Sequence, residues 1–361
     1  MTEPLLGFFA PWVIFGLILG LQAFVPARRV EGYARDEASN KPIVYRLNGL
    51  SVFLIVVAAW FAAGYTGVMP YEWLWEHRWS GLAGAFALGL IASGIAMVGV
   101  PARSASRLKD YFLGRRENPS LAGGRVDAKM YLYVAGAILL ELNLLSFAAH
   151  HVLSYPTDPS PGVILYICLF SWFVCEYLVY EHVHLYTYDL FAERLGFKLI
   201  WGCLMFYPYC YGMGLWAVAD LANPHSPAWY LVLSAVIFFS GWIFARGANM
   251  QKYYFKRNPS HVFLGLFKPQ SISDGERQVL CSGFWGLSRH VNYLGEVLMA
   301  TGLTLALGWP WLIVPWLYPL YYVVLLTTRE RDDDRRCEEK YGELWHRYRE
   351  KVPRRIVPYI Y

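Results

Sequence analysis

Cations, amides and aromatic rings gather in one stretch of this sequence, from Arg246 to Tyr293. The stretch begins ARGANMQKYYFKRNP and, after a polar segment, ends SGFWGLSRHVNYLGE. Arginine and lysine bind phosphates, and aromatic walls hold flat rings, so this composition suits a dinucleotide. A basic loop with interfacial aromatic residues would look the same, and that alternative stays open. The residues concerned are Arg246, Asn249, Gln251, Lys252, Tyr253, Tyr254, Lys256, Arg257, Trp285, Arg289, His290, Asn292 and Tyr293.

A second group of charges begins at Arg329 and reads RERDDDRRCEEKYG. Three consecutive aspartates stand directly after an apolar run there. Such a run is usually a solvated face paired with nearby arginines. The functional alternative is that one carboxylate, Asp333, faces back toward the Lys/Arg stretch.

A third group lies at the end of an apolar run and reads CEYLVYEHVHLYTYDLFAERLGF. On a continuous helix, Tyr177, Glu181, His184 and Tyr188 would share one face, with Glu176 nearby. A carboxyl group at membrane depth is costly, usually faces a cavity, and can hold a proton near neutral pH. The alternative is a helix that emerges into the interface, where such residues cost little.

The elements that position these groups are membrane helices. The chain has 361 residues, 56% of them hydrophobic and only 16% charged, which excludes a disordered chain, a coiled coil and a soluble nucleic-acid binder. Apolar runs of about 20 residues can cross a bilayer. We expect an all-α polytopic bundle of about nine spans, within a range of about eight to ten. They lie near 5–25, 48–70, 80–100, 130–149, 161–180, 195–219, 228–246, 291–308 and 310–328.

The distribution of positive charge predicts the topology. With a cytoplasmic C-terminus, every Lys and Arg except Arg78 falls in the inside segments 26–47, 101–129, 181–198, 246–290 and 329–361. The basic surplus therefore serves topology, and we expect no nucleic-acid partner. We also expect the tail from Arg329 to be helical until Pro353, and the first apolar run to be a retained span.

Other chemistries leave no signature in the sequence. The chain lacks a GxGxxG, a P-loop and an HExxH motif. Its six cysteines form no CxxC pair and no zinc-type cluster, so we expect reduced thiols and no metal.

The whole pattern resembles the integral-membrane sterol reductases. That family includes sterol carbon-14 reductase, 7-dehydrocholesterol reductase, the fungal carbon-24(28) reductase and the membrane half of the lamin B receptor. The resemblance covers nearly all of the chain and is most specific from Arg246 onward. It rests on VPARRVEGY, YRLNG, DYFLGRRENP, Asp127-Ala128-Lys129, RGANMQKYYFKRNP, SGFWGLSRHVNYLGE, RERDDDRRCEEKYGELWHRY and VPRRIVPYIY.

The resemblance implies NADPH as the reductant and a cytoplasmic cofactor pocket in the C-terminal part. It predicts one integral-membrane domain over 1–361, with substrate-side spans in 1–245 and NADPH binding in 246–361. Lys256 and Asp332 stand where relatives often have arginine. The positions matching the family's cofactor motifs are Lys252, Lys256, Trp285, Arg289, His290, Asn292, Tyr293, Arg329, Asp333 and Tyr341.

The resemblance also implies a reaction, reduction of a carbon–carbon double bond in a sterol taken from the bilayer, with carbon 14 favoured. A proton must reach the unpolarised alkene before hydride can add. We expect Glu181 or Glu176, with Tyr177, to supply or relay that proton, and Asp333 to orient the cofactor side. The middle of the chain departs from the family at Phe173, Glu176 and Cys203, where relatives often carry Tyr, Asp and Asp.

Two alternatives remain. The RHVNYLGE element and the ending resemble isoprenylcysteine methyltransferases, which use S-adenosylmethionine, but Val291 replaces the proline that usually follows RH there. The second alternative is a relative that binds a sterol or lipid and has lost its activity. The membrane would be that of the endoplasmic reticulum in a eukaryote and the inner membrane in a bacterium.

Overall fold

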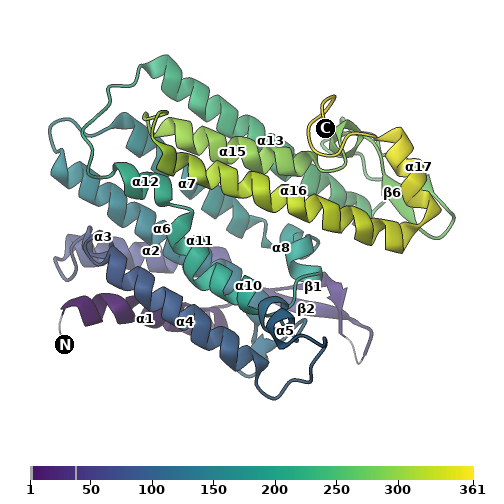
Figure 1. The fold of residues 1–361 in the computed structure, drawn as a ribbon, viewed down its shortest axis with the longest axis horizontal. Coiled ribbons are helices and arrows are strands. Elements are labelled where there is room, and N and C mark those ends of the chain that lie inside the picture. Colours follow the sequence, from purple (N-terminus) through teal and green to yellow (C-terminus); the bar gives the residue numbers. More distant parts are fainter. Residues whose placement is uncertain (1–2, 37–38) are drawn as a thin grey trace. The chain divides into compact units, whose positions relative to one another are not determined.

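The computed structural model describes residues 3–36 and 39–361, and the chain divides into two compact units, Met1–Asn223 and Pro224–Tyr361. Most described residues lie in helices (Figure 1). Among them, five helices are long and apolar enough to cross a membrane, so the chain is an integral membrane protein, as its composition predicts. These are α1 (Glu3–Phe24), α4 (Arg78–Met97), α6 (Ala128–Ser154), α7 (Pro161–Val179) and α13 (Ala228–Arg257).

The spans of the first unit are organised around α6, whose side chains are mostly buried. The Asp127 side chain caps its start by accepting hydrogen bonds from the Lys129 and Met130 N–H groups, at 3.0 and 2.9 Å. The Lys129 side chain is fully buried and donates to the carbonyl groups of Leu190 and Glu193. The Asp127-Ala128-Lys129 element therefore fixes where α6 begins. The unit also contains α2 (Gly49–Tyr65), α3 (Trp73–Glu76) and α5 (Arg107–Leu113).

The sequence predicts one continuous span over 195–219, and the structure breaks it into pieces. A π-helical turn begins at Gly202, Pro208 removes a backbone donor in the next segment, and Gly212 separates the last two segments. Each of these residues weakens a regular α-helix, which explains the interruptions. The pieces are α10 (Phe197–Trp201), the π-helix η1 (Gly202–Phe206), α11 (Tyr207–Cys210) and α12 (Met213–Val218).

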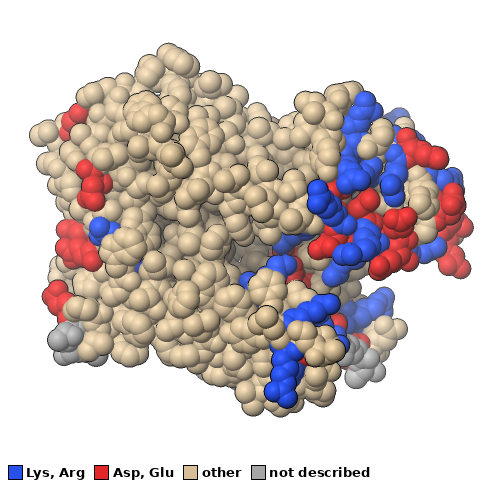
Figure 2. Space-filling view, viewed as in Figure 1, with Lys and Arg blue, Asp and Glu red and all other residues tan. Residues whose placement is uncertain are grey.

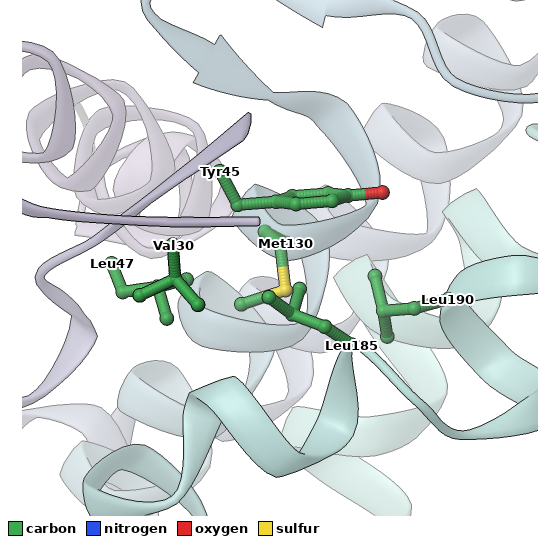
Figure 3. Packing of buried hydrophobic residues seen from close by; sticks show 6 residues of the cluster. All are labelled: Val30, Tyr45, Leu47, Met130, Leu185 and Leu190. Atoms are coloured by element: carbon green, nitrogen blue, oxygen red, sulfur yellow. The ribbon is translucent and has the colours of Figure 1, made fainter. Parts of the chain in front are cut away.

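Three two-stranded antiparallel hairpins depart from the expected all-α fold. The largest pairs β1 (Arg28–Arg35) with β2 (Pro42–Leu47). Figure 3 shows how its Val30, Tyr45 and Leu47 pack beside Met130 of α6 and beside Leu185 and Leu190 from the segment that follows α7. The others pair β3 (Ser120–Leu121) with β4 (Val126–Asp127) and β5 (Ser271–Ser273) with β6 (Gln278–Leu280). The strands of these two smaller hairpins have only two or three residues each, too few for a readable alternation.

The second unit is built on close packing between α13 and α15 (Val291–Ala306). A Cβ added at Gly241 would lie 2.5 Å from the Gly295 carbonyl oxygen, and one at Gly302 would lie 2.7 Å from the Phe238 nitrogen. Glycine at these positions therefore lets the two backbones touch, as small residues do between membrane helices.

The third helix of this unit, α16 (Ile313–Tyr341), continues without a break from the predicted last span into the charged tail. Gly342, with a φ of 54°, turns the chain into α17 (Glu343–Lys351). The expected helical tail before Pro353 is thereby confirmed. The short α14 (Phe284–Leu287) completes the unit, and all six cysteines are free thiols.

Candidate functional site

The charged side chains of the second unit gather at the end formed by α17 and the last turns of α16, while the apolar parts of its three long helices are almost free of charge (Figure 2). All the predicted cofactor residues belong to this unit. Their contacts decide which of them the fold brings together.

Lys252 and Trp285 meet on the surface of α13. The Lys252 ammonium lies 5.1 Å from the centre of the Trp285 ring, a cation–π contact. The Trp285 Nε1–H donates to the Ala248 carbonyl at 2.8 Å, and the Tyr348 hydroxyl donates to the Trp285 carbonyl at 3.0 Å. Trp285 is therefore tied to α13 through its indole ring and to α17 through its backbone carbonyl.

Gln251 ties the loop before Trp285 to α13. Its Oε1 accepts the Phe284 N–H at 3.0 Å, and its Nε2 donates to the Ser282 carbonyl at 3.2 Å. Gly283 has a φ of 62°, and a Cβ there would collide with the Gln251 amide. The chain can approach the helix this closely because this residue is glycine.

Arg289 and His290 are held by the C-terminal tail. Their backbone N–H groups donate to the carbonyls of Arg354 and Arg355, at 3.0 and 2.8 Å. The Arg289 Nη1 donates to the carbonyls of Val352 and Pro353, at 3.0 Å each. The VPRRI element therefore acts as a clamp on the Arg289-His290 pair.

The three consecutive aspartates point to different partners. Asp334 Oδ1 lies 3.7 Å from Arg289 Nε and accepts the Trp345 indole N–H at 3.1 Å. Asp333 Oδ2 lies 3.8 Å from His290 Nδ1. Asp332 is exposed and pairs with Arg335 at 2.5 Å, one turn along the same helix. Asp333 thus faces the predicted cluster, and Asp332 is part of a solvated face.

Asp333 is nevertheless not a simple ion-pair partner. Burial raises the pKa of its carboxyl group, and the nearby positive charges of Lys252 and Arg329 lower it again, so that a net upward shift remains. Arg329, one helical turn before it, is therefore part of the same electrostatic group. Lys256 lies further along α13 and contacts the Tyr341 hydroxyl at 3.3 Å.

His290 is neutral. Burial, together with the positive charges of Arg289 and Lys252, lowers its pKa to about 3. Its contact with Asp333 is consequently a dipolar one and not a salt bridge. The ring stacks on Tyr293 at 4.9 Å between centres.

Two buried polar atoms within residues 290–292 have no hydrogen-bond partner among the described residues. They are Nε2 of His290 and Oδ1 of Asn292. Buried polar groups are nearly always hydrogen-bonded, so these orphaned atoms are what a polar ligand that both donates and accepts hydrogen bonds would satisfy. The residues present therefore fit a dinucleotide.

The proposed acid residues lie in the first unit, and the helix that was expected to carry them ends early. α7 stops at Val179, and the chain continues as the single turns α8 (Glu181–His184) and α9 (Tyr188–Phe191). One continuous face from Tyr177 to Tyr188 is therefore wrong. The rings of Tyr177 and His184 still stack, with their centres 4.0 Å apart.

Glu181 turns toward the start of α2. Its Oε2 accepts the Gly49 N–H at 3.0 Å, one of the free donors at a helix N-terminus. Burial raises the pKa of this carboxyl to about 7, against the lowering effect of that hydrogen bond. Glu176 is also buried, at the end of α7. Glu181 can therefore hold a proton at neutral pH.

Several residues that support Arg289, His290 and Trp285 in the second unit were not predicted from the sequence. Glu330 is fully buried and accepts a hydrogen bond from Arg355 Nη1 at 3.3 Å, and Asp334 and Tyr348 contact Arg289 and Trp285. The sequence signal that could have pointed to Glu330 is its position directly after a span and one helical turn before Asp334. Nothing in the sequence pairs Glu330 with the tail.

Known proteins resemble the chain over its full length. The sequence profile described as the ergosterol biosynthesis ERG4/ERG24 family matches residues 2–361. A Delta(14)-sterol reductase of Arabidopsis thaliana is 32% identical, covering 93% of this chain and 91% of the relative. A Delta(14)-sterol reductase of Methylotuvimicrobium alcaliphilum is 31% identical, covering 98% of this chain and 83% of the relative. The Delta(14)-sterol reductase TM7SF2 of Mus musculus is 32% identical, covering 98% of this chain and 86% of the relative. The chain belongs to the ERG4/ERG24 family of ergosterol biosynthesis.

Proposed function

We propose that this protein reduces a carbon–carbon double bond of a sterol, at carbon 14, with NADPH as the reductant. The observation that carries the proposal is the pair of orphaned buried atoms, His290 Nε2 and Asn292 Oδ1, among the cations of the second unit. Family membership supplies the reaction class, because the relatives are named Delta(14)-sterol reductases.

The cofactor would be held by the residues already described. Lys252 and Arg329 supply positive charge for phosphates, Trp285 and Tyr293 supply ring faces, and Asn292 and His290 supply hydrogen bonds. Lys256 with Tyr341 forms a second cationic contact on α13. Asp333, partly buried beside His290 and Lys252, orients this side of the site. NADPH, when bound, supplies the hydride that completes the reduction.

The protein itself must supply a proton. An isolated alkene is not polarised, so protonation at carbon 15 comes first and leaves a tertiary cation at carbon 14. Glu181 is the best candidate for the proton donor because its pKa of about 7 keeps much of it protonated at neutral pH. Glu176 and Tyr177 are candidates for relaying the proton, and aromatic walls stabilise a cation.

We infer that the chain crosses the membrane about nine times with a cytoplasmic C-terminus. α2 has 17 residues and α15 has 16, short for a span, while α16 carries its apolar part and its charged part in one helix. The support for the count is the bias of Lys and Arg toward one set of loops.

Isotope placement tests the reaction. The detergent-purified protein is given a carbon-14-unsaturated sterol with NADPH deuterated at the transferable position, and separately with unlabelled NADPH in D2O. The proposal expects deuterium at carbon 14 in the first case and at carbon 15 in the second. A product without cofactor deuterium would overturn hydride transfer from NADPH.

The same preparation separates the two alternatives. Binding of S-adenosylmethionine with no effect of NADPH would instead favour the methyltransferase. NADPH binding without oxidation on any sterol would favour an inactive relative, which the departures at Phe173, Glu176 and Cys203 motivate.

A further inference from the structure

A carboxyl group lies at the midpoint of the central helix of the first unit. Glu141 stands halfway along α6 (Ala128–Ser154), and its residue surface is only 2% exposed. It belongs neither to the acid residues near Glu181 nor to the cofactor cluster, the group of Lys252, Trp285, Arg289, His290, Asn292, Arg329 and Asp333. An ionisable residue deep within a membrane helix is costly and usually functional.

The carboxyl group is only half satisfied. Its Oε1 accepts a hydrogen bond from the Ser171 hydroxyl of α7 at 2.5 Å. Its Oε2 is buried and has no hydrogen-bond partner in the described part of the chain. Cys175, one turn after Ser171, lies close enough to interact electrostatically with it. A buried polar atom without a partner destabilises the fold, so a ligand that hydrogen-bonds this oxygen would be favourable.

We propose that Glu141 and Ser171 bind the hydroxyl group of the sterol substrate, an inference that rests on the proposed function. A sterol is apolar except for its hydroxyl group, which both donates and accepts hydrogen bonds. It can therefore satisfy Oε2 whether or not the carboxyl group carries the proton. Serine and glutamate together give the polar end of the sterol a partner inside the bilayer.

The position of Ser171 on α7 gives this contact a role in specificity. Ser171 precedes Glu176 and Tyr177 on the same helix by five and six residues, a separation of about 7–9 Å along the axis. A rigid fused-ring skeleton spans such a length. Fixing its hydroxyl end at Glu141 would set which ring carbon lies near the proton-donating residues.

Binding measurements test this without needing turnover. Affinities of a carbon-14-unsaturated sterol and of its 3-deoxy analogue are measured on the detergent-purified wild type, Glu141→Leu, Ser171→Ala and Asn143→Leu. Asn143 is the matched control, because it is buried on the same helix but its Nδ2 already donates to the Pro208 carbonyl at 2.9 Å.

We expect the wild type to prefer the hydroxylated sterol by about 10-fold to 100-fold. Glu141→Leu should abolish most of that preference and Ser171→Ala part of it, while Asn143→Leu keeps it. If Glu141→Leu does not fold, the preference of the wild type and its reduction in Ser171→Ala still test the proposed hydroxyl site. Equal affinities for both sterols in the wild type, or equal weakening of both in Glu141→Leu, would overturn the inference.

Turnover separates this inference from the proposed function. A wild type that reduces the sterol but binds both analogues alike overturns the hydroxyl site and leaves the reductase intact. A wild type that prefers the hydroxylated sterol but never reduces it supports the site and overturns the reductase. No binding of either sterol overturns both.

Discussion

Arg355 places its Nη1 atom 3.3 Å from Oε2 of Glu330, and the acidic member of this pair is fully buried whereas the basic member is more than a third exposed. The pair joins α16 to the tail whose carbonyls hold Arg289 and His290. Burial raises the pKa of Glu330, and the positive charge of Arg355 opposes that shift. The tail therefore serves the cofactor cluster by neutralising a buried charge as well as by hydrogen bonding.

Replacing Arg355 by leucine should destabilise the second unit. The change leaves Glu330 buried without its cation, and we expect a loss of about 1–3 kcal/mol, less than for a fully buried pair because Arg355 is partly exposed. Thermal unfolding in detergent measures it. Arg354→Leu is the control, since Arg354 contacts the exposed Tyr359 ring and should cost under about 0.5 kcal/mol. Equal losses in the two variants would contradict the role of the pair.

The three aspartates should separate into three phenotypes. Asp332→Asn removes only an exposed pair and should leave NADPH affinity and stability nearly unchanged. Asp334→Asn weakens contacts to Arg289 and Trp345 and should lower the unfolding temperature. Asp333→Asn should weaken NADPH binding about tenfold with little change in unfolding temperature. Calorimetric titration and thermal unfolding of the three proteins check this. Similar affinities in Asp332→Asn and Asp333→Asn would contradict the assignment of Asp333.

Apolar run length predicts much of this fold. One continuous helix lies within or across every predicted apolar segment except 195–219, where Gly202, Pro208 and Gly212 divide the run into short helices. Hydropathy averages over a window and cannot locate such interruptions. The apolar run 161–180 does match α7 (Pro161–Val179), but its length does not show whether a helix continues beyond the apolar residues.

The cofactor cluster could be proposed from the sequence because its charges are close in sequence and match family motifs. Its supporting contacts were not readable, since they join segments far apart in the chain, such as Glu330 with Arg355 and Gln251 with Phe284. Glu141 was overlooked for another reason. A single carboxyl group barely lowers the hydropathy of a long span, and only the structure gives it Ser171 as a partner.

The neutral state of His290 predicts how acid affects stability. Its pKa is lowered to about 3 in the folded protein, whereas the unfolded chain has the ordinary histidine value of about 6.5. Below that value the unfolded state takes up a proton that the folded state refuses, so stability falls as the pH drops from about 6.5 toward about 3.

His290→Gln should therefore lose less stability than the wild type between pH 7 and pH 5, a difference that approaches 1.4 kcal/mol per pH unit at most. Unfolding temperatures at several pH values measure it. His346→Gln is the control, because His346 is half exposed on α17 and its replacement should keep the wild-type slope. Parallel slopes for His290→Gln and the wild type would show that His290 is not held neutral.

The contact between Glu181 and Gly49 gives a way to shift the proposed acid without replacing it. A Cβ at Gly49 would lie 2.6 Å from Glu181 Oε1, so Gly49→Ala must displace the carboxyl group and disturb the hydrogen bond that lowers its pKa. With the protonated form as the donor, sterol reduction by the wild type should fall as the pH rises through about 7. In Gly49→Ala this fall should move to higher pH, and Glu181→Gln should reduce turnover at least about 100-fold at every pH. The control is Gly16→Ala on α1, where an added Cβ meets no atom within 4 Å, and its profile should match the wild type. If Gly49→Ala and the wild type have the same pH profile, and folded Glu181→Gln keeps its turnover, Glu181 does not take part in the reaction. Glu176 and Tyr177 would then be the proton donors to test.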